Sequence, residues 1–243
     1  MTITNATVQI PVADGTTMPA YLFGPAADQA PAGVIVAHEL FGVNPDIRGV
    51  ADDLAKAGYL TIAPEFYHRD APPGRWLERN DAGRQEGFNL LHRLQRQQAL
   101  ADVTACIGWL TSQPPIRKIA MIGFSAGGHL SYLAACCLPI TQTAVLYGGW
   151  LPTTDIPMSQ PSPTLDLTPG ISGQILYLVG EDDTLINAGQ RSQIHAALHE
   201  AGIEHEMVSY PGTGHAFFWP DTPAFSQYAR HDAWSRILAM LAS

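Results

Sequence analysis

The chain has 243 residues, of which 46% are hydrophobic and 14% are charged, and its formal net charge is -9. This composition is typical of a globular protein with a large core and excludes a disordered or fibrous chain. With only 13 Lys and Arg, the chain is not expected to bind nucleic acid or an anionic membrane, because both require a basic surface.

The N-terminal segment, the lack of a long apolar run and the cysteines predict a cytoplasmic protein. The N-terminus lacks the basic and then apolar segments of a signal peptide, and no apolar run reaches the length of a membrane span. Three cysteines, an odd number in apolar, helix-like segments, predict free buried thiols: Cys106, Cys136 and Cys137. No linker or repeat is evident, so residues 1–243 are expected to form a single domain.

Strand and helix signals alternate along the chain. A hairpin at a sheet edge is predicted over residues 4–10 and 18–23. Further strands are predicted over residues 33–39, 59–64, 118–124, 143–147, 174–180 and 204–210. Helices are predicted over residues 45–57, 81–112 with a break, 129–138, 188–201 and 223–242. This alternation predicts an α/β fold with a mostly parallel central sheet, helices on both faces, and functional sites at the carboxyl ends of strands.

Five prolines between residues 150 and 173 predict a long irregular loop in this span. Such a loop in a compact domain is either a functional cap over a site or a plain surface excursion.

The strand at 118–124 ends in Gly-Phe-Ser-Ala-Gly, residues 123–127. A serine between two glycines at a strand-to-helix turn is typical of a nucleophile elbow, in which a Cβ at either glycine would collide with a neighbouring element. Ser125 is therefore the predicted nucleophile. The N–H of Ala126, at the helix start, is predicted to donate to an oxyanion, and Leu40 N–H, after strand 33–39, is the candidate second donor.

A serine hydroxyl needs a base that is itself oriented by an acid. His215 follows a glycine-bracketed turn at the end of a predicted strand and is the predicted base. Three consecutive carboxylates follow strand 174–180. Asp183 is the predicted acid because its spacing from the preceding glycine and from Ile186 resembles the acid loop of α/β-hydrolases. Asp182 is the alternative.

Together these motifs resemble the dienelactone hydrolase family over nearly the whole chain. The segments that carry the resemblance are residues 38–44, 63–67, 123–128, 180–183 and 214–217. The resemblance implies an α/β-hydrolase fold without a large separate lid domain and without a cofactor. It also implies hydrolysis of small esters or lactones through an acyl-enzyme, with carboxymethylenebutenolidase activity among the candidates.

The chain departs from the family pattern at two places. The best-known members carry cysteine where this chain has Ser125, so Glu39, which matches the glutamate that interacts with that thiolate, either helps polarise the serine or is a buried carboxylate paired with a cation. Those members also hold the substrate carboxylate with two arginines. Arg84 matches the first, whereas the second position holds Trp219, which with the two preceding phenylalanines is expected to form an aromatic wall.

The remaining polar residues have plainer interpretations. His195 and His199 lie one helical turn apart but lack a His-Glu-x-x-His motif, so no metal site is expected. A solvated basic region is predicted from five arginines: Arg69, Arg75, Arg79, Arg93 and Arg96. The expected partner is a small-molecule ester or lactone, and the expected state is a monomer or small homo-oligomer. Alternatives are an acyl transferase or peptidase that uses the same serine, or a non-catalytic ligand-binding module.

Overall fold

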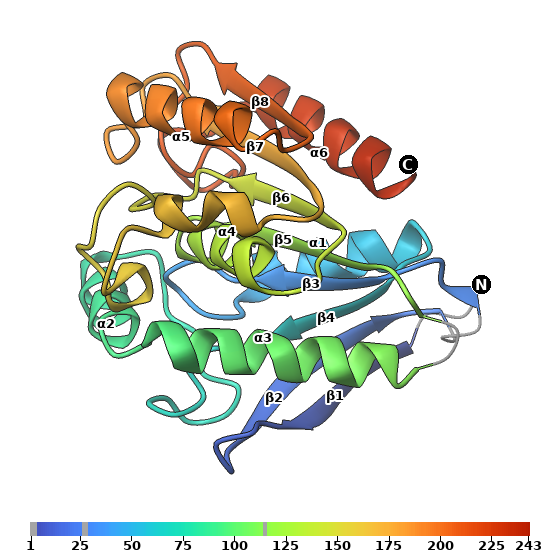
Figure 1. Ribbon diagram of the computed structural model, residues 1–243. Helices are drawn as coiled ribbons and strands as arrows, with labels where there is room; N and C mark the ends of the chain where they lie inside the picture. The colour runs from blue at the N-terminus through green and yellow to red at the C-terminus, as the bar shows by residue number, and fades with distance from the viewer. Residues whose placement is uncertain (1–3, 26–28, 114–115) are drawn as a thin grey trace. The chain divides into compact units, whose positions relative to one another are not determined.

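The structure of the protein is a computed structural model that describes residues 4–25, 29–113 and 116–243 (Figure 1). The chain forms two compact units, one of residues 1–121 with 156–158 and one of residues 122–155 with 159–243. The single domain expected from the sequence stays a prediction. No helix among the described residues is long and apolar enough to cross a membrane.

Four strands of the first unit lie in the order β1-β2-β4-β3: β1 (Thr4–Pro11), β2 (Thr17–Gly24), β3 (Gly33–Ala37) and β4 (Leu60–Pro64). The first two form the predicted antiparallel hairpin, in which Ile10 lies opposite Met18. Strand β2 is also antiparallel to β4, whereas β3 runs parallel to β4. All residues of β3 and β4 are buried, as their continuous apolar sequences predict for central strands.

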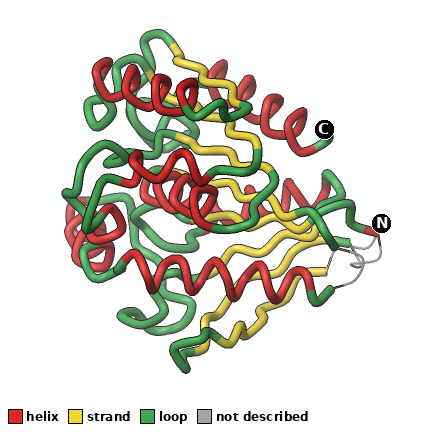
Figure 2. Tube along the Cα trace, in the orientation of Figure 1, coloured by secondary structure: helices red, strands yellow, loops and turns green. Residues whose placement is uncertain are grey.

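Three helices belong to this unit: α1 (Pro45–Lys56), α2 (Asp81–Leu91) and α3 (Arg96–Thr111). Asn44 and Asn80 cap α1 and α2 by accepting hydrogen bonds from backbone N–H groups in the first turn. The break predicted between residues 81 and 112 lies at residues 92–95. Helix α1 packs on β2, β3 and β4, whereas α3, which crosses in front of the strands in Figure 2, packs on β1 and β3.

The second unit contains the end of β5 (Ile119–Phe124) and three parallel strands: β6 (Gln142–Leu146), β7 (Gln174–Gly180) and β8 (His205–Tyr210). Gln142 pairs with Gln174, and Ile175 pairs with His205. The carboxyl ends of these strands therefore lie at one edge, where the loops after β7 and β8 meet.

The helices of the second unit are α4 (Ala126–Cys137), α5 (Ala188–Glu200) and α6 (Gln227–Leu241). Helix α4 packs on β6, and α6 packs on β6 and β7. Helix α6 begins four residues later than the sequence predicts, because Ser226 is its N-cap and accepts a hydrogen bond from Ala229 N–H.

The segment predicted to be irregular is more regular than expected. It contains two 3₁₀ helices, η2 (Pro157–Ser159) and η3 (Thr164–Gly170). Short i→i+3 turns tolerate the proline spacing that excludes an α-helix, and η3 packs on α4 and α5. The prediction of buried cysteines is wrong for Cys137, whose position at the last residue of α4 leaves it exposed; Cys106 and Cys136 are buried, and none of these three cysteines forms a disulfide.

Candidate active site

The elbow at the end of β5 has the geometry that its sequence predicts. Ser125 adopts φ 53° and ψ -113°, a strained conformation for a residue with a side chain. Its N–H donates to Leu146 O at 2.9 Å. A Cβ on Gly123 would lie 2.0 Å from Gly127 O, which explains the first glycine of the motif.

Within the second unit, Ser125, His215 and Asp183 form a continuous hydrogen-bonded chain. Ser125 Oγ lies 2.9 Å from His215 Nε2, and His215 Nδ1 lies 2.8 Å from Asp183 Oδ2. Because a carboxylate can only accept, His215 Nδ1 carries the proton and Nε2 is left to accept from the serine hydroxyl. This tautomer is the one that a general base requires.

The loop after β7 decides which of the consecutive carboxylates reaches the histidine. The Asp183 side chain is fully buried, and its second oxygen accepts from Leu185 N–H at 2.9 Å. Asp182 is exposed. A Cβ on Gly180 would lie 2.0 Å from Thr213 O, so this glycine allows the acid loop and the histidine loop to approach closely.

Tyr147, which the sequence analysis did not single out, packs against the histidine. The Tyr147 and His215 rings are 5.0 Å apart in an edge-to-face arrangement. Tyr147 has a φ of 40°, and Tyr177 Oη donates to the next carbonyl, that of Gly148, at 2.7 Å. The glycine pair after Tyr147 at the end of a buried strand was the available signal for this unusual turn.

Each unit contains one predicted oxyanion donor whose backbone N–H makes no hydrogen bond to a described residue. Among the described residues, neither Ala126 N–H nor Leu40 N–H donates to a protein acceptor. Ala126 is the first residue of α4, where backbone N–H groups have no partner within the helix. Leu40 lies just beyond β3 and is buried.

Glu39 is a buried carboxylate with a cationic partner that the sequence analysis did not identify. Arg79 Nε donates to Glu39 Oε1 at 2.9 Å, and its Nη1 donates to Asp46 Oδ2 at 2.5 Å. One of the two interpretations of Glu39 is thereby confirmed, namely a buried carboxylate paired with a cation. Its predicted influence on Ser125 stays a prediction.

The predicted solvated basic region is wrong for three of its five arginines. Arg79 is bound to carboxylates as described above. Arg69 donates two hydrogen bonds to the buried Asp102, at 2.8 and 2.7 Å. Arg96 Nε donates to Met158 O at 2.8 Å. These pairs could not be predicted from local sequence patterns because the partners lie on other elements.

The two residues predicted to contact the substrate, Arg84 and Trp219, differ in solvent exposure. Arg84, in the first turn of α2, is exposed, and its guanidinium makes no hydrogen bond or ion pair with the part of the chain that the structure describes. Trp219 is only 2% exposed, and its ring packs 4.7 Å from Phe124 and 5.1 Å from Phe218. The rings of the predicted aromatic wall are buried, and that of Trp219 packs against Phe218; contact of this wall with a substrate stays a prediction.

Across residues 4–25, 29–113 and 116–243, no group of three or more His, Cys, Asp and Glu side chains is arranged to hold a metal ion. The His195 and His199 rings stack with centroids 6.3 Å apart.

Comparison with known proteins gives a consistent result. The sequence profile of the dienelactone hydrolase family matches residues 18–243. A Synechocystis protein named "Putative carboxymethylenebutenolidase" is 33% identical, over 89% of this chain and 88% of its own length. A Salmonella typhimurium protein of the same name is 32% identical, over 94% of this chain and 83% of its own length.

A solved structure agrees with the sequence relatives. The "Putative Dienelactone Hydrolase from Klebsiella pneumoniae subsp. pneumoniae" superposes with a TM-score of 0.88 and 28% identity, over 100% of both chains. This likeness confirms the predicted α/β-hydrolase fold with its mostly parallel sheet. The chain therefore belongs to the dienelactone hydrolase family and is a hydrolase of carboxylic esters or lactones.

Proposed function

We propose that the protein is a serine hydrolase that cleaves small carboxylic esters or lactones through an acyl-enzyme. The observation that carries this proposal is the hydrogen-bonded chain from Ser125 Oγ through His215 to the buried Asp183. Catalysis of this kind needs a nucleophile, a base and an orienting acid within hydrogen-bond reach, and all three are present in one unit.

In the proposed reaction, Ser125 Oγ attacks the carbonyl carbon while His215 Nε2 takes the hydroxyl proton. A C–O bond forms, and the carbonyl electron pair moves to the oxygen, which receives hydrogen bonds from the N–H groups of Ala126 and Leu40. The bond to the leaving oxygen then breaks, and this oxygen takes the proton from His215. Water repeats the sequence on the acyl-enzyme, and the acid product and free Ser125 result.

For the substrate, we propose small neutral esters and lactones, with the carboxylate-bearing dienelactone a substrate that is not superior to them. The exposed Arg84 offers one cation for a substrate carboxylate. The second arginine position of the family pattern holds the buried Trp219. Loss of one bidentate arginine contact costs roughly 1.5 to 3 kcal/mol of anion binding.

The mechanism is tested by a serine-directed phosphonate and by two substitutions. The phosphonate should label the protein at Ser125 alone. Ser125→Ala and His215→Ala should each lower kcat by about a thousandfold or more, and the double variant should be little worse, because the groups act as a unit. Full activity in Ser125→Ala would refute the proposed mechanism.

A further inference from the structure

The imidazole of His38 is bound to the backbone just after β3. His38 Nδ1 lies 2.7 Å from Glu39 O, and the residue is only 4% exposed. Because a carbonyl oxygen can only accept, the proton of this hydrogen bond belongs to Nδ1. The rings of Phe66 and Tyr67, with centroids 5.7 and 4.8 Å away, pack against the imidazole and restrict its rotation.

The bonded carbonyl belongs to the same peptide unit as a proposed oxyanion donor. In a trans peptide the C=O of Glu39 and the N–H of Leu40 are coplanar and point in opposite directions. A hydrogen bond that fixes the position of Glu39 O therefore also fixes the direction of Leu40 N–H. Gly42 N–H also donates to Glu39 O, at 3.4 Å, and this longer distance makes it a weaker donor than His38.

We propose that His38 is a positioning residue that orients the Glu39–Leu40 peptide so that Leu40 N–H is held ready for the oxyanion. This inference deepens the proposed function and rests on it. Among the described residues, Leu40 N–H has no acceptor of its own, so no hydrogen bond from this N–H fixes the peptide. The carbonyl side of the peptide, where His38 donates, is where the orientation is set.

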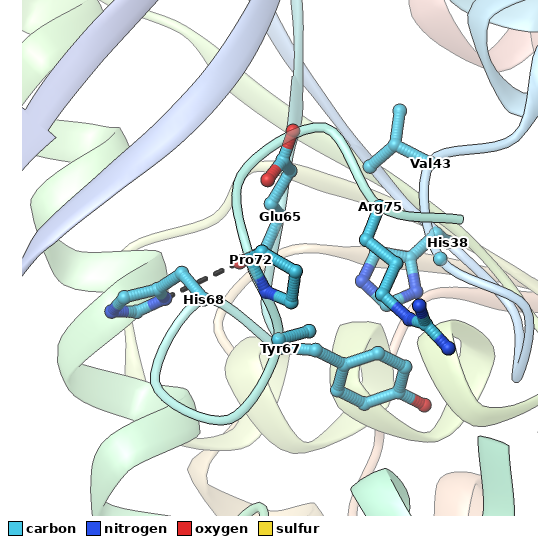
Figure 3. A pocket seen from close by; sticks show the side chains of 9 residues that line it. His38, Val43, Glu65, Tyr67, His68, Pro72 and Arg75 are labelled. Carbon is cyan, nitrogen blue, oxygen red and sulfur yellow. Dashed lines mark hydrogen bonds between the residues drawn. The ribbon is translucent and has the colours of Figure 1, made fainter. Parts of the chain in front are cut away.

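With the proton on Nδ1, His38 Nε2 is a buried hydrogen-bond acceptor. No described residue donates to this nitrogen. His38 lines a small cavity together with Tyr67, His68 and Arg75 (Figure 3). The space open to the centre of a water molecule is about 10 Å³, which is near the least that holds one water.

Burial supports the neutral state of this side chain. Desolvation lowers the pKa of His38 from 6.5 to about 4. At neutral pH the ring therefore carries one proton, and the hydrogen bond to Glu39 O determines which nitrogen holds it.

The test compares His38→Asn with His38→Leu, two side chains of similar shape. Asn can place an N–H where Nδ1 was, whereas Leu cannot donate. We expect His38→Leu to lower kcat by about tenfold to a hundredfold, part of the loss seen when an oxyanion donor is removed, with KM little changed. His38→Asn should restore most of kcat, and affinity for a boronate transition-state analogue should follow kcat.

His68→Leu is the matched control. His68 lines the same cavity, and its Nδ1 also lies close to a backbone carbonyl, that of Glu65 at 3.2 Å. Its hydrogen-bond and ion-pair partners are Thr16, Glu65 and Asp102 rather than the Glu39–Leu40 peptide, so we expect this variant to change thermal stability and leave kcat unchanged. Equal loss of kcat in His68→Leu and His38→Leu would overturn the proposal, because cavity packing would then explain both.

Two further measurements separate this inference from the proposed function. Nitrogen NMR of ¹⁵N-histidine-labelled protein should find the His38 proton on Nδ1, and a proton on Nε2 would overturn the proposal. Replacement of Leu40 by its α-hydroxy acid removes the backbone N–H. If this ester variant loses kcat while His38→Leu does not, Leu40 is a donor but His38 does not position it. If Ser125→Ala is active, the proposed function itself fails.

Discussion

At the scale of single residues, Asp183 and Asp182 are adjacent carboxylates in different environments. Asp183 is buried and bonded to His215, whereas Asp182 is exposed. We expect Asp183→Asn to lower kcat by on the order of 10³ to 10⁴, because the amide cannot hold the base in its tautomer. Asp182→Asn is the matched control and should cost little. Steady-state kinetics of both variants measures the two losses of kcat. A larger loss in Asp182→Asn would show that Asp182, and not Asp183, orients His215.

Arg84 is the residue that we expect to bind the carboxylate of an acidic substrate. Arg84→Ala should lower kcat/KM for an acidic lactone by about tenfold to a hundredfold, the worth of one charge-assisted contact, and should affect a neutral ester of similar size much less. The ratio of the two kcat/KM values is the measurement. An unchanged ratio would mean that Arg84 does not contact the substrate carboxylate. Trp219→Arg is not a useful complement, because it would place a charge within a packed aromatic cluster.

At the scale of elements, the start of α4 lies unusually close to the end of β6. A Cβ on Gly128 would lie 2.8 Å from Leu146 O and 3.0 Å from Gly148 Cα. We expect Gly128→Ala to destabilise the protein by roughly 1 to 3 kcal/mol, because backbone atoms would have to move apart, and to lower activity by displacing the elbow. Denaturant unfolding and steady-state kinetics measure the two effects.

The matched control for this substitution is Gly108→Ala in α3. A Cβ on Gly108 meets nothing within 4 Å, so the variant should be more stable by about 0.5 to 1 kcal/mol. If both alanine variants are equally stable, the close approach of α4 to β6 does not constrain the elbow.

At the scale of the whole molecule, His38 links stability to pH. Its folded pKa is lowered to about 4 by burial, against 6.5 for an ordinary histidine, so the unfolded chain binds the proton more tightly. The stabilising contribution is therefore complete above about pH 6.5 and is lost as pH falls towards 4. It amounts to at most on the order of 3 kcal/mol.

His38→Asn removes the titrating group, so the free energy of unfolding of this variant should fall less between pH 7 and pH 4.5 than that of the wild type. Denaturant unfolding at the two pH values measures the difference. Parallel curves for the two proteins would show that His38 is not neutralised by burial.

Most strands and helices could be predicted from the sequence, because their signals are local. The buried strands β3 and β4 are continuous apolar runs, and Asn44 and Asn80 are N-caps whose role depends only on the next few residues. The elbow was predictable for the same reason, since steric conflict at Gly123 arises within one turn. Residues 157–170 were missed because 3₁₀ turns have no periodic apolar signal.

By itself the sequence determined the family and the candidate nucleophile and base, because each depends on short motifs at the ends of strands. Only the tertiary structure decided that Asp183 rather than Asp182 meets His215, that Glu39 pairs with Arg79, and that the predicted aromatic wall lies in the core. These facts depend on contacts between residues far apart in the chain. Burial and pairing are properties of three-dimensional neighbours, and no local spacing specifies them.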